Sequence, residues 1–217
     1  MNSELEQTGI HFNLDDYLSA QEKSRQVVLE FSQKINPGID EQSARTLLES
    51  MLNESGLEKR WHPTKFRMGP NTVKNFRDES EPYILQEEDI FFADIGPVYY
   101  KHEGDYGESF TIGNNKKHKH LVQSTKTIFS KTHKIWKEHK LTGNELYKFA
   151  EEEARQLNLR LNSNMYGHRL GDFPHAVYSK ETLGKLDFTP APKLWVLEIH
   201  LIDDEINRGA FFEDILL

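Results

Sequence analysis

The stretch FFADIGPVYYKHEGDYGESF, residues 91–110, places two aspartates among apolar residues that are typical of buried β-strands. The two are Asp94 and Asp105. Buried carboxylates in neighbouring strands repel each other and lose hydration unless a cation, a shared proton or a basic side chain neutralises them. A metal ion does this most directly. The alternative is that both aspartates cap turns beside Gly96 and Gly104, which aspartate next to glycine commonly does.

The sequence on either side of this stretch predicts a sheet flanked by helices. Short apolar or alternating runs between residues 60 and 112, and again over 193–201 and 209–217, indicate antiparallel strands. Helical spacing of apolar residues predicts helices over 15–35, from 40 to about 52, over 116–139, and from a capping box at 142–145 to about 157. The order helix, helix, sheet, helix, helix, sheet indicates one α+β domain, residues 1–217, with two similar halves.

The composition excludes several classes of protein. The chain has 217 residues, a formal net charge of -8 and no cysteine. The negative charge disfavours nucleic acid and anionic membranes, and no apolar run approaches the roughly 18 to 20 residues of a membrane span. The N-terminal sequence carries no basic and apolar leader, which favours a cytoplasmic protein. Without cysteine, carboxylates and histidines must hold any metal ion.

A histidine between glycines provides one such ligand. His168 lies in GHRLG, residues 167–171, and His175 follows it by seven positions (175 − 168 = 7). Flanking glycines let the backbone approach a site closely, and a neutral imidazole is a common metal ligand, although a lone histidine is more often structural.

Two glutamates complete the set of candidate ligands. Glu198 interrupts LWVLEIHL and Glu213 interrupts GAFFEDILL, and either alone could face solvent by strand alternation. Together, four carboxylates and one histidine suit manganese, cobalt, iron or zinc. Bridging carboxylates can hold two such ions about 3.5 Å apart, and such a pair activates water.

In order and spacing, these residues resemble the ligands of the pita-bread metallopeptidases, the family of methionine aminopeptidase, aminopeptidase P, prolidase and creatinase. That family presents Asp, Asp, His, Glu and Glu, with aspartates eleven positions apart, as Asp94 and Asp105 are (105 − 94 = 11). Its histidine lies in a G-H-x-x-G turn seven positions before a second histidine, and its last glutamate belongs to an E-D pair, here Glu213-Asp214. The resemblance covers nearly the whole chain and implies the pita-bread fold, an antiparallel sheet with flanking helices in two pseudo-symmetric halves.

The resemblance also implies a dinuclear metallo-exopeptidase (aminopeptidase, Xaa-Pro aminopeptidase-like or dipeptidase) that hydrolyses the N-terminal bond of short peptides. Asp105 and Glu213 would bridge two divalent ions, manganese, cobalt, iron or zinc. Glu198 would shuttle protons, and His175 would contact the substrate carbonyl or its leaving amide. The implied metal ligands are Asp94, Asp105, His168, Glu198 and Glu213.

The chain departs from the family pattern in three places. The family's substrate-contacting histidine follows an asparagine by five positions, but Phe76 follows Asn71 there, and His62 in a neighbouring segment is the alternative donor. Phe211 stands where proline-specific members carry an arginine, which leaves proline specificity open. Only fifteen positions separate the two glutamates (213 − 198 = 15), which predicts a shortened substrate rim.

Two other functions fit the same residues. One is a metal-free, creatinase-like carbon–nitrogen hydrolase with His175 as acid and base, although retention of all five ligand types argues against it. The other is an inactive relative that binds peptides or a partner protein through the same cleft. The oligomeric state stays open, with a homodimer among the options, and residues 118–120 predict a solvated helix face. The candidate linings of the cleft are Phe76, Phe211 and Tyr166.

Overall fold

The computed structural model describes residues 4–217, so residues 1–3 of the predicted domain lie outside the described residues. The helices are α1 (Leu14–Ser32), α2 (Glu41–Glu54), α3 (Lys116–His139) and α4 (Gly143–Gln156), with short 3-10 helices η1 (Gly69–Val73), η2 (His175–Val177) and η3 (Leu183–Lys185). The strands are β1 (Lys59–Arg60), β2 (Lys65–Met68), β3 (Asp89–Ile95), β4 (Pro97–Tyr99), β5 (His102–Glu103), β6 (Tyr106–Ile112), β7 (Arg160–Leu161), β8 (His168–Arg169), β9 (Trp195–Asp203) and β10 (Arg208–Ile215).

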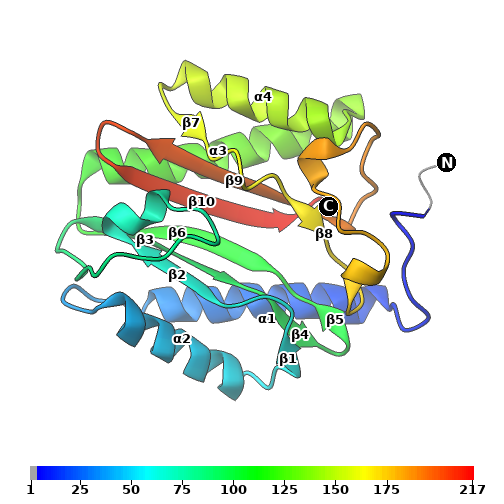
Figure 1. Cartoon of the computed structure of the whole chain (residues 1–217), viewed down its shortest axis with the longest axis horizontal. Coiled ribbons are helices and arrows are strands. Elements are labelled where there is room, and N and C mark those ends of the chain that lie inside the picture. Colours follow the sequence, from blue (N-terminus) through cyan, green and yellow to red (C-terminus); the bar gives the residue numbers. More distant parts are fainter. Residues whose placement is uncertain (1–3) are drawn as a thin grey trace.

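An antiparallel sheet of seven strands organises the fold (Figure 1). Its order is β2-β3-β6-β10-β9-β7, with β8 pairing with β9, while β1, β4 and β5 form a smaller sheet. The pair β3 and β6, preceded by α1 and α2, meets the pair β9 and β10, preceded by α3 and α4, along the β6–β10 contact. The predicted α+β architecture with two similar halves is confirmed.

Side-chain alternation along the strands separates the core from the opposite face of the sheet. Ala93 and Ile95 of β3 pack in the cluster that contains the buried faces of α1 and α2, and Leu197 of β9 packs in the cluster that contains those of α3 and α4. Because successive strand side chains point to opposite faces, Asp94 and Glu198 face away from the helices. The helices therefore cover one face, and the buried carboxylates gather on the other.

Capping residues explain where the helices begin. The Asn13 side chain accepts from two backbone N–H groups of α1, Asp40 caps α2, and the predicted capping box of Thr142 and Glu145 opens α4. The first helix ends at Ser32, three residues before the predicted end at residue 35. Within the described residues, no helix combines the length and the apolarity needed to cross a membrane.

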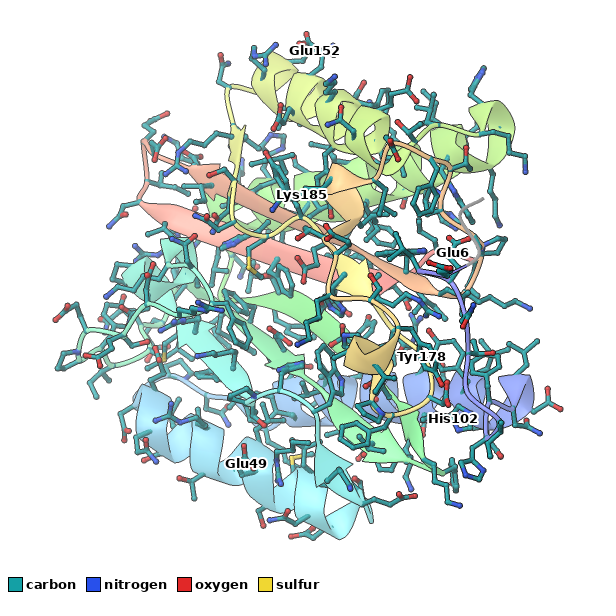
Figure 2. The ribbon with its side chains drawn as sticks, turned by 45° about the vertical axis from the view of Figure 1, so that its right-hand side comes forward. Glu6, Glu49, His102, Glu152, Tyr178 and Lys185 are labelled. Atoms are coloured by element: carbon teal, nitrogen blue, oxygen red, sulfur yellow. The ribbon has the colours of Figure 1, made fainter. Side chains whose placement is uncertain are left out.

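The segment before α1 lies against the second half of the molecule. Glu6, labelled in Figure 2, accepts hydrogen bonds from the Ala191 backbone (2.7 Å) and from Trp195 Nε1 (2.8 Å). The buried Arg169 guanidinium donates to the carbonyls of Leu5 (3.1 Å) and Gln7 (2.8 Å). These contacts fix β8, the strand that also contains His168.

Two expectations about exposure are wrong. His118 is 7% exposed, because it lies on the side of α3 that packs on the sheet, whereas residues 119 and 120 are exposed as predicted. Phe211 is 1% exposed and clusters with Phe92 and Met165 beneath the cleft, so it does not line it.

Candidate active site

One cavity of about 270 Å³ gathers the predicted metal ligands on the face of the sheet away from the helices. A larger hollow of about 920 Å³ lies over α2 and β2, but its lining mixes acidic and basic side chains and contains no histidine. The chemistry therefore points to the smaller cavity. Its lining residues are Trp61, His62, Phe76, Asp94, Asp105, Asn164, Met165, Tyr166, Gly167, His168, Thr182, Glu198 and Glu213.

The sheet register aligns the carboxylates. Glu213 pairs with Glu198 on one side and with Gly107 on the other, and Gly107 pairs in turn with Asp94. A Cβ atom at Gly107 would lie 2.6 Å from Glu213 Oε1, so only glycine leaves room for that carboxylate. Asp105 immediately precedes β6. All four carboxylate side chains belong to residues that are at most 9% exposed.

His168 faces two of these carboxylates through one nitrogen. Its Nε2 lies 2.8 Å from Asp105 Oδ2 and 3.6 Å from Glu198 Oε1, while its Nδ1 lies 2.8 Å from the carbonyl oxygen of Arg169. A carbonyl only accepts, so Nδ1 holds the proton and a neutral ring presents its Nε2 lone pair to the carboxylates. That arrangement is unfavourable unless a cation or an additional proton lies between them.

The surrounding charges shift several pKa values strongly. Burial raises the pKa of Asp94 to about 7, although the charge of the nearby His62 acts in the opposite direction and lowers it. Burial, followed by the charges of Asp105 and Asp94, raises the pKa of Glu213 well above its ordinary range. Burial alone would lower the pKa of His168, but the adjacent carboxylates, chiefly Asp105, raise it to about 10. The site thus takes up protons in the absence of other cations.

The site also has carboxylate oxygens without hydrogen-bond partners. Among the described residues, Glu213 Oε1 is buried and accepts no hydrogen bond. Asp105 Oδ2, also buried, can accept one only when His168 carries a second proton on Nε2, 2.8 Å away. Buried acceptors without donors are unusual and call for a cation or an ordered water. The hard carboxylate oxygens and the imidazole therefore fit divalent metal ions.

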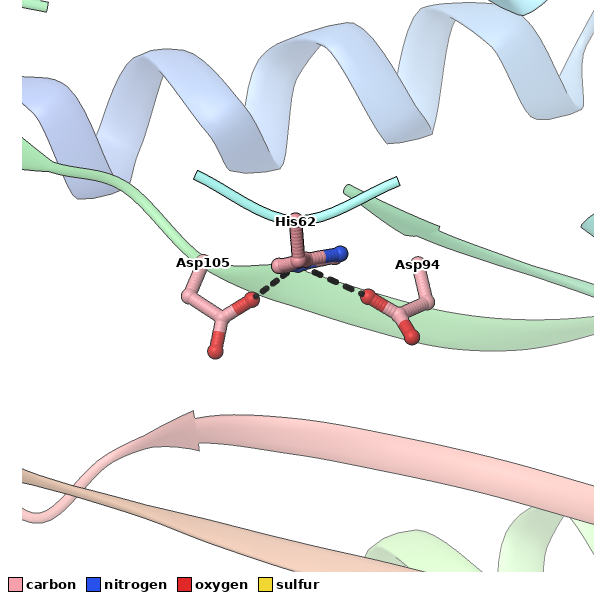
Figure 3. Close-up of side chains that lie close together, drawn as sticks. All are labelled: His62, Asp94 and Asp105. Carbon is pink, nitrogen blue, oxygen red and sulfur yellow. Dashed lines mark hydrogen bonds and ion pairs between the residues drawn. The ribbon is translucent and has the colours of Figure 1, made fainter. Parts of the chain in front are cut away.

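His62 lies between the two aspartates (Figure 3). Its Nε2 is 3.5 Å from Asp94 Oδ1 and 3.3 Å from Asp105 Oδ1. It comes from the connection between β1 and β2, and its ring packs on Phe76 at 5.6 Å between centroids. The alternative donor suggested by the sequence is therefore in the cavity.

His175 lies at the edge of the site, outside the residues that line the cavity. Its ring centroid is 6.1 Å from that of His168 and 5.2 Å from that of Trp61. Glu103 holds it twice: Oε1 accepts from the His175 backbone N–H (3.0 Å), and Oε2 lies 2.7 Å from Nδ1. Sequence reasoning missed Glu103, although a carboxylate two positions before Asp105 was a visible signal.

Side chains from the helices hold the ligand strands in place. On α1, Gln21 accepts from the Asp105 backbone N–H (2.9 Å) and donates to Asp214 (2.9 Å). On α4, the Tyr147 hydroxyl donates to the Glu198 carbonyl (3.0 Å) and accepts from its N–H (3.2 Å). Such outer contacts fix the orientation of metal ligands and are important for affinity.

An antiparallel sheet in two similar halves, with carboxylates and a histidine converging on its open face, is the arrangement of the pita-bread fold. The chain belongs to metallopeptidase family M24, whose model matches residues 15–217. This confirms the family resemblance and the predicted pita-bread fold. Metallopeptidases of this family use divalent metal ions.

Solved structures show the same fold. An X-Pro aminopeptidase from Thermotoga maritima matches with a TM-score of 0.77 and 19% identity, over 95% of this chain and 62% of that chain. A prolidase from Pyrococcus horikoshii matches with a TM-score of 0.76 and 17% identity, over 93% of this chain and 58% of that chain. A methionine aminopeptidase from Thermotoga maritima matches with a TM-score of 0.72 and 15% identity, over 99% of this chain and 92% of that chain. The chain therefore spans about six-tenths of the first two proteins. A search of curated proteins found no match.

Proposed function

We propose that this protein is an exopeptidase that hydrolyses the N-terminal peptide bond of short peptides with the help of two divalent metal ions. The observation that carries the proposal is the convergence of four buried carboxylates and the His168 Nε2 lone pair on one cavity, with Glu213 Oε1 left without a partner. Membership of a metallopeptidase family supports the reaction class.

The ions would be held by the residues that the family pattern supplies. When bound, they lower the pKa of a water molecule and polarise the scissile carbonyl. Asp105 and Glu213 are the candidates to contact both ions, since Asp105 belongs to both groups of ligand atoms and the charges of Asp105, Asp94 and Glu198 all act on Glu213. Manganese, cobalt, iron and zinc all suit this donor set. The proposed ligands are Asp94, Asp105, His168, Glu198 and Glu213.

Glu198 and His175 would handle protons. Glu198 is buried, and burial raises its pKa, which suits a carboxylate that accepts a proton and passes it on. Its Oε2 accepts from the Gly167 backbone N–H at 2.9 Å, so its orientation is fixed. The carboxylate of Glu103 accepts from His175 Nδ1–H, which leaves Nε2 free to take up a proton and return it to the leaving amine.

The cavity suits a small substrate. Its volume of about 270 Å³ lies near the lower end of ligand pockets, which typically span about 300–1,000 Å³. Phe76, Tyr166 and Met165 provide an apolar wall that could accept an apolar N-terminal side chain. Phe211 stands where proline-specific members carry an arginine, so the peptide panel below includes substrates with and without proline. We propose short peptides as substrates.

Release of the N-terminal residue from a peptide panel tests the proposal. Metal-stripped protein re-supplied with manganese should cleave at least one of Met-Ala-X, Ala-Pro-X and X-Pro peptides, and Glu198→Ala should abolish that release. The preferred peptide would define the subgroup. Protein that neither binds metal nor releases residues would instead support the metal-free hydrolase or the binding-only relative.

Glu103→Gln should lower kcat by about 10²-fold while KM and thermal stability change little, because general acid–base catalysis contributes about that much or more. The glutamine oxygen can still accept from the His175 backbone, but its amide donates to Nδ1 and so places the ring proton on Nε2. Steady-state kinetics on the preferred peptide measures the effect.

The matched control is a double-mutant cycle. If Glu103 acts through the ring, Glu103→Gln adds little to the effect of His175→Gln. Additive effects of the two changes, or an equal fall in stability and kcat, would instead mean that Glu103 has only a structural role.

A further inference from the structure

We propose that His62 is a sixth metal ligand, outside the set that the family pattern supplies, so that each of the two ions receives one imidazole. The inference rests on the proposed function, because it concerns the same pair of ions. It follows from how the two imidazoles are placed around one shared carboxylate.

Asp105 has one imidazole at each of its oxygens. His62 Nε2 lies 3.3 Å from Oδ1, and His168 Nε2 lies 2.8 Å from Oδ2. The ligand atoms form two groups that share Asp105: one with His62 and Asp94, the other with His168 and Glu213, each within 4.8 Å. Two groups that share a bridging carboxylate are what two neighbouring ions require.

Both rings are oriented by the same contact. Nδ1 of His62 lies 2.9 Å from the carbonyl oxygen of Pro63, and Nδ1 of His168 lies 2.8 Å from that of Arg169, in each case the next residue in the chain. Since a carbonyl only accepts, each neutral ring directs its Nε2 lone pair at carboxylate oxygens. A backbone carbonyl on the far nitrogen is the usual way in which proteins fix a metal-binding histidine.

The chain makes a dedicated space for the His62 ring. A Cβ atom at Gly96 would lie 2.1 Å from its Cδ2 and 2.4 Å from its Nε2, so a larger residue there would displace the ring. Trp61 packs on the ring edge-on at 4.3 Å between centroids and is itself fixed by a hydrogen bond from Nε1 to the Gly104 carbonyl (3.0 Å). The His62 side chain is 11% exposed. The ring is therefore held in place before any ion binds.

His62 thus differs in task from the histidine that Phe76 replaces. The family's histidine contacts substrate, whereas His62 Nε2 is directed at the two carboxylates of Asp94 and Asp105. A nitrogen ligand at both ions shifts preference away from manganese, because imidazole suits zinc and iron while carboxylate and water suit manganese, and because affinity for such sites also rises from manganese to cobalt. The metal preference of this protein is then set in part by the β1–β2 connection.

Calorimetric titration of the metal-stripped protein with cobalt chloride tests the assignment. The wild type should bind two ions, and His62→Phe, which keeps a ring against Trp61, should weaken one of them by about 10–100-fold, at least the effect of losing an outer-shell partner. The loss should be larger for cobalt than for manganese. His175→Phe, a matched change at a neighbouring histidine, should leave both affinities unchanged.

X-ray absorption of the zinc-loaded protein gives a second readout that needs no activity. The wild type should show one imidazole per ion on average, and His62→Phe half that number. If His62→Phe does not fold, as judged by circular dichroism, His62→Gln takes its place. Two ions bound with unchanged affinity and imidazole count in the variant would overturn the His62 assignment alone. A wild type that binds no metal would overturn both this assignment and the proposed function.

Discussion

Stripping the divalent ions should lower the melting temperature of this protein by about 10 °C at neutral to alkaline pH. An ion present at about 1,000 times its Kd adds about 4 kcal/mol to the free energy of unfolding. In a chain of this size each kcal/mol shifts the melting temperature by about 2–4 °C. The stripped protein must keep the buried carboxylates of Asp94, Glu198 and Glu213 together without their cations, which is the physical origin of the loss.

The size of this effect should grow with pH. In the metal-free folded protein the pKa of Asp94 is about 7 instead of 3.8, and that of His168 is about 10 instead of 6.5. The folded state therefore holds more protons than the unfolded chain across this interval. Stability from these groups is complete below the unfolded pKa values and is lost as pH rises through the folded ones. Metal ions replace the lost protons, so they stabilise more at about pH 8 than at about pH 5.

Differential scanning calorimetry of stripped and manganese-loaded protein at these two pH values measures both effects. Magnesium serves as the control ion: it prefers oxygen ligands and dehydrates reluctantly, so it should raise the melting temperature less than manganese does. A melting temperature that is the same with and without metal at both pH values would contradict the proposal that the cluster holds ions.

Glu213→Gln should lower kcat/KM by at least about 10³-fold, or about 4 kcal/mol of transition-state stabilisation, while the stripped variant melts close to stripped wild type. Burial and the neighbouring aspartates raise the pKa of Glu213 well above its ordinary range, which favours its protonated form in the metal-free protein. Glutamine resembles the protonated acid in shape and charge, but it cannot act as an anionic ligand between two ions. Kinetics and thermal unfolding of the same preparation measure the two effects.

Asp214→Asn is the matched control for this change. Asp214 is the next residue, but it faces the helices and pairs with Arg25 and Gln21 instead of the cavity. Its loss should lower stability and leave most of the activity. Glu213→Gln that retains more than a tenth of wild-type activity would show that Glu213 does not hold the ions.

Much of the fold was predictable because its signals are local. Helix α3 begins at Lys116 and ends at His139, as its apolar periodicity predicts. The predicted capping box at Thr142 is also present. The expectation for His118 fails because a lysine-rich sequence does not reveal which turn of the helix faces the sheet. Phe211 was misplaced for a similar reason: it shares a strand face with Glu213, but Phe92 and Met165 cover it.

The candidate site was predictable where its residues follow a spacing and not where only tertiary contacts unite them. The five predicted ligands converge on one cavity because their strands are neighbours in the sheet. His62 could be named from the sequence only as an alternative donor, because it lies 32 positions before Asp94 (94 − 62 = 32) and its place depends on the pairing of β1 with β4 and on the space above Gly96. Glu103 belongs to a two-residue strand that has no periodic signal.

The placement of the ligands in both halves of the sheet has a mechanical consequence. Asp94 and Asp105 belong to the first half, and Glu198 and Glu213 to the second, so ions held by all four would tie β3 and β6 to β9 and β10. A chain without cysteine has no covalent staple. The ions would act as reversible cross-links between residues 119 positions apart (213 − 94 = 119). They would hold only in the folded protein, because the unfolded chain has no preformed site. Chelation would then act on this protein as reduction acts on a disulfide-bonded one, by letting its two halves open independently.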